Sequence, residues 1–174
     1  MTKEEFGDVN REANENVAFQ YFQEFMTMHA SPEWVSTHTD GEYDRWDVTA
    51  TNGKKVVYAE TKIRHIHADA IKDEGAIIDE SKVLDLKNKD GDAIIVFFFH
   101  RDNATYAWNV TESDEWAIGT KTTRKNNYTD EKVDKKVCYM PIDKKHRRKG
   151  PDLSGYQERY AAEFQRIKEN KGYE

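Results

Sequence analysis

The chain has 174 residues, 34% charged and 37% hydrophobic, and this length predicts one domain over 1–174 with a sizeable core. No apolar stretch approaches the ~20 residues of a membrane span, and the acidic N-terminus lacks the apolar core of a signal peptide. The single cysteine, Cys138, excludes an internal disulfide and a multi-cysteine zinc site, so we expect a protein of the reducing cytoplasm.

The N-terminal half of the sequence predicts one helix followed by three strands. The expected elements are a helix over 9–28 and strands over 34–39, 43–51 and 55–64. Helical spacing of apolar residues supports the first, and alternation of apolar and polar residues supports the strands. Asn52-Gly53, between the last two strands, is typical of a two-residue hairpin turn.

The C-terminal half predicts a second helix, a buried strand and several additions. The expected elements are helices over 78–88 and 154–170 and strands over 93–100, 104–110 and 136–142. The stretch AIIVFFFH is too continuously apolar for an edge strand and indicates a buried one. Ser154 and Gln157 have the spacing of a capping box at the start of the last helix.

The predicted hairpin carries the strongest functional pattern. Alternation places Glu60 and Lys62 on one face of their strand, about 6.5–7 Å apart. A two-residue turn would pair Asp47 with Tyr58 and set it diagonal to Glu60. Two carboxylates and an ammonium are costly as core filling. They suit a site that holds a hard metal ion with oxygen ligands.

Asp47, followed by Glu60-Thr61-Lys62 in this order of elements, resembles the PD-(D/E)XK nuclease superfamily, which has the restriction-endonuclease-like fold. The resemblance covers about residues 10–99. One departure is that Trp46, not proline, precedes Asp47. The resemblance implies an α/β fold with an αβββαβ core, in which helices flank a mixed central sheet. The extra C-terminal strands and the C-terminal helix would be additions to that core.

The resemblance also implies an activity, the hydrolysis of phosphodiester bonds in DNA with Mg²⁺ or Mn²⁺. Asp47, Glu60 and the backbone carbonyl of Thr61 would hold the metal. Lys62 would orient the attacking water and stabilise the transition state. Asp44 competes with Asp47, but alternation places it on the opposite face. The alternative is an inactive protein of this fold that binds DNA or a protein partner. The small size suggests a phage or mobile-element enzyme, and a homodimer is left open.

Two helical residues are further candidates for this site. Lys82 shares a stripe with Ile78 and Leu86 on the predicted second helix, where a lysine can also extend to solvent. The resemblance implies a catalytic basic side chain from this helix. It also implies an extra metal ligand from the first helix, for which Glu15 lies beside the buried face and Glu12 competes.

The charge is uneven along the chain. Residues 121–150 hold eleven Lys and Arg and four Asp and Glu, whereas the whole chain has a net charge of −6. Such a segment suits a polyanion, and we expect Lys144, Lys145, Arg147 and Arg148 to bind nucleic acid beside the carboxylates. A solvated loop is the alternative.

Overall fold

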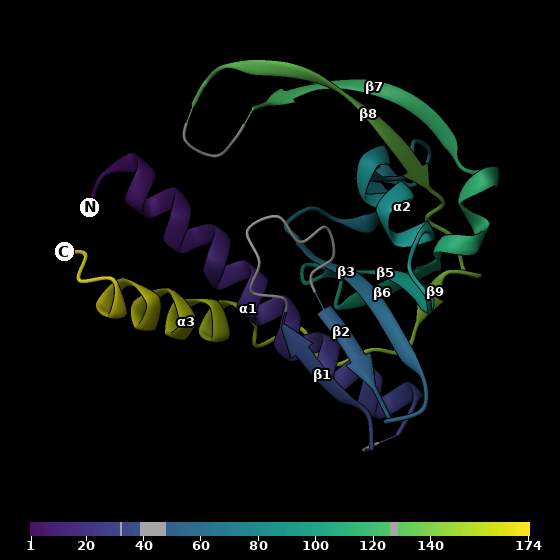
Figure 1. Ribbon diagram of the computed structural model, residues 1–174. Helices are drawn as coiled ribbons and strands as arrows, with labels where there is room; N and C mark the ends of the chain where they lie inside the picture. The colour runs from purple at the N-terminus through teal and green to yellow at the C-terminus, as the bar shows by residue number, and fades with distance from the viewer. Residues whose placement is uncertain (32, 39–47, 126–128) are drawn as a thin grey trace.

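The computed structural model describes residues 1–31, 33–38, 48–125 and 129–174 (Figure 1). The helices are α1 (Lys3–His29), α2 (Glu80–Lys87) and α3 (Tyr156–Asn170), with short 3₁₀ helices η1 (Ala68–Ile71) and η2 (Val110–Glu115). The strands are β1 (Val35–His38), β2 (Val48–Thr51), β3 (Val56–Arg64), β4 (Ala76–Asp79), β5 (Asp92–Phe99), β6 (Ala104–Asn109), β7 (Ala117–Arg124), β8 (Lys132–Met140) and β9 (Arg147–Arg148).

The predicted αβββαβ order is confirmed by α1, β1, β2, β3, α2 and β5. These strands belong to a sheet of order β1-β2-β3-β5-β6-β9, in which β3 and β5 are parallel and the other neighbours are antiparallel. The fold is therefore a mixed central sheet flanked by helices, with strands and a helix added after β5. No helix among the described residues is long and apolar enough to cross a membrane.

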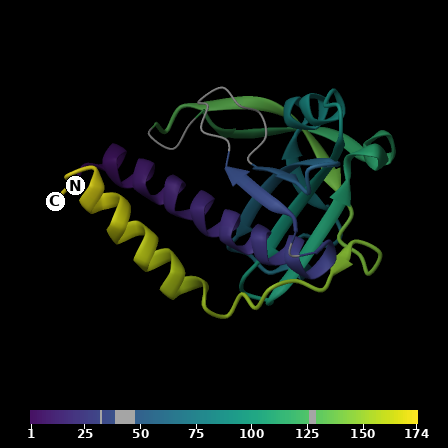
Figure 2. The ribbon, with the colours of Figure 1, turned by 60° about the horizontal axis from the view of Figure 1, so that its bottom comes forward.

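Helices cover the two faces of this sheet in different ways. On one face, α1 packs with Val17 and Phe22 against Ala59 and Phe98. The α3 helix lies alongside α1 (Figures 1 and 2), and Arg159 on α3 forms an ion pair with a glutamate of α1 at 2.9 Å. On the other face, a larger buried cluster joins β5 and β6 to α2, β4 and β8.

The two terminal helices begin at different places from those predicted. Thr2 and Glu5 form a capping box, so α1 begins at Lys3 instead of residue 9. The predicted capping box at Ser154 is wrong, because the N-cap of α3 is Gly155 and no side chain caps the helix. The Ser154 N–H donates instead to Asp152 at 3.0 Å.

A second sheet, of order β4-β8-β7, was only partly predicted. The helix expected from residue 78 begins at Glu80, because Ala76 to Asp79 pair with β8 as strand β4. Ile78 is therefore a buried strand residue, not a helical neighbour of Lys82. Strand β7 was not expected, and β8 begins at Lys132 instead of residue 136.

The hairpin between β2 and β3 has a longer loop than predicted. Thr51 pairs with Val56, so residues 52–55 form the loop, and the Asn52 side chain accepts the N–H groups of residues 54 and 55. Gly53 has a φ of 87°, which glycine adopts without steric cost. The predicted pairing of Asp47 with Tyr58 is wrong, because Tyr58 faces Thr49. Asp44, Trp46 and Asp47 lie outside the described residues.

Candidate active site

A pocket of about 270 Å³ lies along the C-terminal half of β3, beyond Ala59, which pairs with Val48 at the start of β2. The side chains that line it come from α1, β3, the residue after β3, and α2. They are Arg11, Asn14, Glu15, Ala18, Glu60, Thr61, Lys62, Ile63, Arg64, His65 and Lys82. The pocket therefore collects the predicted Glu60, Thr61, Lys62, Lys82 and Glu15.

Glu60 is the most buried charged residue of this pocket, with 1% of its surface exposed. Its Oε1 accepts a charge-assisted hydrogen bond from the ammonium of Lys82, whose side chain is 32% exposed. Lys82 lies in the first turns of α2, directly after β4. The strand that ends at Asp79 thus fixes where α2 begins, and α2 directs a cation at the buried carboxylate.

Lys62 lies two residues beyond Glu60 on the same side of β3. Burial lowers the pKa of Lys62, and the nearby Lys82 ammonium lowers it further, whereas the Glu60 carboxylate acts in the opposite direction. The ammonium of Lys62 therefore loses its proton more readily than a lysine in water. Next on this side is Arg64, whose guanidinium carbon lies 5.7 Å from the centre of the Phe97 ring.

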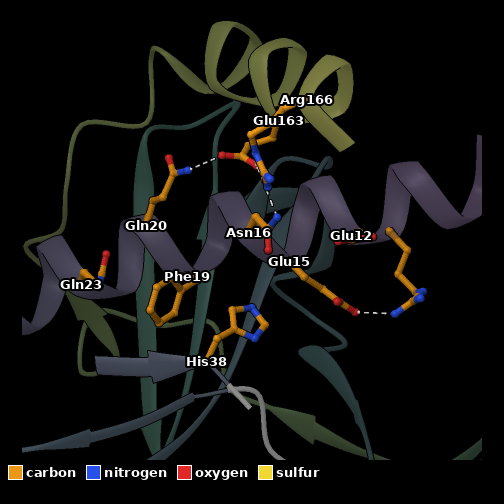
Figure 3. A pocket seen from close by; sticks show the side chains of 10 residues that line it. Glu12, Glu15, Asn16, Phe19, Gln20, Gln23, His38, Glu163 and Arg166 are labelled. Atoms are coloured by element: carbon orange, nitrogen blue, oxygen red, sulfur yellow. Dashed lines mark hydrogen bonds and ion pairs between the residues drawn. The ribbon is translucent and has the colours of Figure 1, made fainter. Parts of the chain in front are cut away.

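Glu15 reaches this pocket from α1 and is 41% exposed at its side chain. It forms an ion pair with Arg11 at 3.2 Å, one turn earlier on the helix. Figure 3 shows Glu15 at the border of a neighbouring groove between α1, β1 and α3. Glu12 lines that groove but not the pocket of Glu60, and it pairs with Lys171 at 3.1 Å. Of the two glutamates considered from the sequence, Glu15 is the one at the pocket.

The oxygen ligands that this pocket offers are of the type that a hard cation prefers. Glu60 and Glu15 present carboxylate oxygens, which Mg²⁺ and Mn²⁺ prefer. The Lys82 ammonium lies against a Glu60 oxygen. A metal ion bound by Glu60 would compete with this ammonium for the carboxylate. Among residues 1–31, 33–38, 48–125 and 129–174, no three His, Cys, Asp or Glu side chains form a group that could hold a metal ion. Asp47, the predicted second ligand, is not among these residues.

The basic segment lies apart from this pocket. Lys144, Arg147 and Arg148 line a second pocket of about 690 Å³. Strand β9 holds the two arginines at the edge of the sheet, with β5 and β6 between it and β3. Lys145 lines a different hollow, beside Tyr139. The sequence predicts these four cations beside the carboxylates. The structure places them instead at two pockets that do not contain Glu60.

Histidines lie close together where β3 and β5 end. His65 Nδ1 and His100 Nε2 lie 3.0 Å apart, and the His100 ring stacks on Tyr156 at 4.2 Å. His67 contacts Asp102 at 2.5 Å. Burial lowers the pKa of both His65 and His100, and nearby arginines add to this effect. The parallel pairing of β3 and β5 brings the residues after each strand together.

No protein-family model matches this sequence, and no curated protein matches it significantly. The solved structures that are similar to the chain include two nucleases. One is Hjc from Archaeoglobus fulgidus, a Holliday junction resolvase of an archaeal hyperthermophile, with 15% identity, a TM-score of 0.41, and coverage of 80% of this chain and 94% of that one. The other is a bacterial homing endonuclease, with 13% identity, a TM-score of 0.40, and coverage of 91% and 94%. Both TM-scores are low, so a function for this chain has to be argued from its own site.

Proposed function

We propose that this protein is a divalent-metal-dependent nuclease that hydrolyses phosphodiester bonds in DNA. The observation that carries the proposal is the burial of Glu60 in one pocket with Lys62 and Lys82. Buried charges are costly unless they are paired or serve a ligand, and such clusters are typical of functional sites. The order Glu60-Thr61-Lys62 on the third strand of an αβββαβ core is the arrangement that the sequence resemblance implies.

The charge of the pocket favours an anionic substrate. Its lining contains four basic side chains, from Arg11, Lys62, Arg64 and Lys82, and two carboxylates. Without a ligand, these cations repel one another, as the effect of Lys82 on the pKa of Lys62 indicates. A phosphodiester group would relieve this repulsion, and it would be held next to the carboxylates that are proposed to bind the metal.

Each residue has a distinct proposed role. Glu60, Asp47 and the carbonyl of Thr61 would hold the metal, and Glu15 would add a ligand from α1. The metal, when bound, would polarise the phosphodiester and lower the pKa of a bound water. Lys62 would orient this water and neutralise the charge that develops on the phosphoryl oxygens.

Lys82 has a positioning role in this proposal. It holds the Glu60 carboxylate while no cation is bound, and its exposed stem lets it move aside when the metal or the substrate enters. Lys144, Arg147 and Arg148 would hold DNA at the far edge of the sheet, as a secondary contact. The strands between the two pockets are spaced about 4.8 Å apart, and a double helix is wide enough to span them.

The test combines metal binding with cleavage in three proteins. Mn²⁺ titration calorimetry and cleavage of plasmid and oligonucleotide substrates are measured for the wild type, Glu60→Gln and Lys62→Met. We expect Glu60→Gln to lose both metal binding and cleavage. Lys62→Met should lose cleavage but keep most of the metal affinity, because a protonated lysine has no lone pair for a metal.

Two results would contradict the proposal in different ways. A Lys62→Met protein that cuts at the wild-type rate would refute the proposed role of Lys62. A wild-type protein that binds no divalent cation and cuts nothing would assign the chain to the alternative, an inactive protein of this fold. Glu15→Gln serves as the matched control for Glu60→Gln, since it removes a more exposed carboxylate from the same pocket. Its effect on metal affinity should be smaller.

A further inference from the structure

The second sheet extends into a two-stranded arm. Strand β4 pairs with β8 only as far as Asp79 with Val137, whereas β7 and β8 stay paired out to Arg124 with Lys132. We call residues 120–124 and 132–136 the ribbon arm. Figure 1 shows β7 and β8 curving away from α2 and over the molecule toward the N-terminal part of α1. Beyond the arm, Asp130 lies 3.5 Å from the Lys3 ammonium at the start of α1.

The two faces of the ribbon arm differ in their surroundings. At the base, Cys138 and Met140 face the buried core together with Ile78 of β4. Alternation continues this face outward along both strands, and we call it the inner face. Its residues in the ribbon arm are Thr120, Thr122, Arg124, Lys132, Asp134 and Lys136. All six are exposed, so the inner face stops packing against the protein where the arm begins.

The basic side chains on the two faces of the ribbon arm differ in their ionic contacts. Among the described residues, Arg124, Lys132 and Lys136 form no ion pair, and the one carboxylate of this face accepts a hydrogen bond from Thr122 at 2.5 Å. The lysines on the opposite face are all paired with acids. Lys121 pairs with Glu74 at 2.5 Å, Lys125 with Glu131 at 3.6 Å, and Lys135 with Asp79 at 3.9 Å. The free positive charge of the arm is thus on one side.

The ribbon arm begins next to the candidate active site. Asp79 ends β4 and directly precedes α2, which carries Lys82 to Glu60. Because β8 continues past the level of Asp79, the arm extends beyond the site instead of ending beside it.

We propose that the ribbon arm binds duplex nucleic acid, with Arg124, Lys132 and Lys136 on the phosphates of the duplex that the candidate active site cuts. This inference rests on the proposed function and names its substrate as double-stranded. Two strands about 4.8 Å apart, with their side chains, match a major groove about 12 Å wide. The five residues of each strand of the arm make four steps and span about 13 Å, which is about four base pairs of rise. A single strand has no groove of this width.

The experiment measures binding without cleavage, as fluorescence anisotropy in EDTA between about 50 and 200 mM NaCl. The probes are a labelled duplex and its single strand. The inner-face variant R124Q/K132Q/K136Q is compared with the outer-face variant K121Q/K125Q/K135Q, which removes the same charge from the same hairpin. We expect the inner-face variant to lower the slope of log K against log salt on the duplex by about 2 to 3. The outer-face variant should change this slope by less than about 1, because its lysines are held by acids.

The outcomes separate this inference from the proposed function. Equal slopes for the two triple variants, in a wild type that binds and cuts the duplex, would overturn the role of the arm and leave the nuclease proposal intact. Tighter binding of the single strand than of the duplex would overturn the substrate class. A wild type that binds neither probe would refute both proposals together. If the inner-face triple variant fails to fold, Lys132→Gln and Lys136→Gln are tested singly, and each should lower the slope by about 0.9.

Discussion

Replacement of Glu60 by glutamine tests the electrostatics of the site independently of catalysis. The side chain keeps its shape, but Lys82 loses its ion-pair partner and Lys62 loses a carboxylate from its pocket. Breaking a buried ion pair costs about 3–5 kcal/mol when the remaining charge cannot escape. Lys82 is 32% exposed and can turn toward water, so we expect the lower cost of a lost charge-assisted hydrogen bond, about 2 kcal/mol. For a chain of this size, that lowers the melting temperature by about 4–8 °C.

The measurement is urea denaturation at neutral pH in EDTA, so that no metal contributes. Glu15→Gln is the matched control, because it removes the other pocket carboxylate, which is 41% exposed and paired with Arg11. An exposed pair of this kind contributes about 0–1 kcal/mol, and the control should lose no more than that. A Glu60→Gln protein that is more stable than the wild type would refute the reasoning. It would mean that repulsion from another carboxylate, and not attraction to Lys82, dominates at Glu60.

Three further predictions concern Lys62, the starts of two helices and His146. Lys62→Met should lower cleavage at least ~100-fold and yet raise the free energy of unfolding at pH 7. The pKa of Lys62 is lowered on folding, so this gain in unfolding free energy should shrink as the pH rises toward 10.5, the ordinary pKa of lysine. Urea denaturation measures the gain, and a gain that grows with pH would contradict the prediction. Thr2→Ala should cost about 1 kcal/mol and Ser154→Ala less than about 0.5, because only the first forms a capping box, and equal melting temperatures would refute this. His146→Leu should cost about 2 kcal/mol in the same assay, since its buried ring contacts two carboxylates at 2.6 and 2.7 Å, and an unchanged stability would show that these contacts contribute little.

The strand that carries Glu60 and Lys62 could be predicted because its pattern is local. Alternation alone assigned both residues to one side of β3, and burial of the next strand followed from an unbroken apolar run. The register of the hairpin could not be predicted from the Asn52-Gly53 pair. Thr51 and the loop that follows it add side-chain hydrogen bonds that favour a four-residue loop, with Thr51 Oγ1 2.8 Å from the Lys55 carbonyl.

The second sheet was only partly predicted, because β7 and the first half of β8 lack an apolar face. Strand β7 has threonines and charged residues where a half-buried strand would have valine or isoleucine, and Ile118 is 62% exposed. Strand β4 precedes α2 without a break, so Ile78 fitted the period of the helix as well as that of a strand. Pairing with β8, which is distant in sequence, decided the outcome.

The separation of the basic residues from the carboxylates also has a topological cause. A segment that is continuous in sequence, from 121 to 150, is divided by the fold between two sheets. Its first part forms the ribbon arm, on the side of α2 and Lys82, and its last part forms β9, at the far edge of the six-stranded sheet. Net charge in a sequence window indicates a polyanionic partner, but it does not say on which side of the site the contacts lie. If both parts bind one DNA molecule, the inner-face variant and a second variant, R147Q/R148Q in β9, should lower the salt slope additively, because their cations are too far apart to share a phosphate.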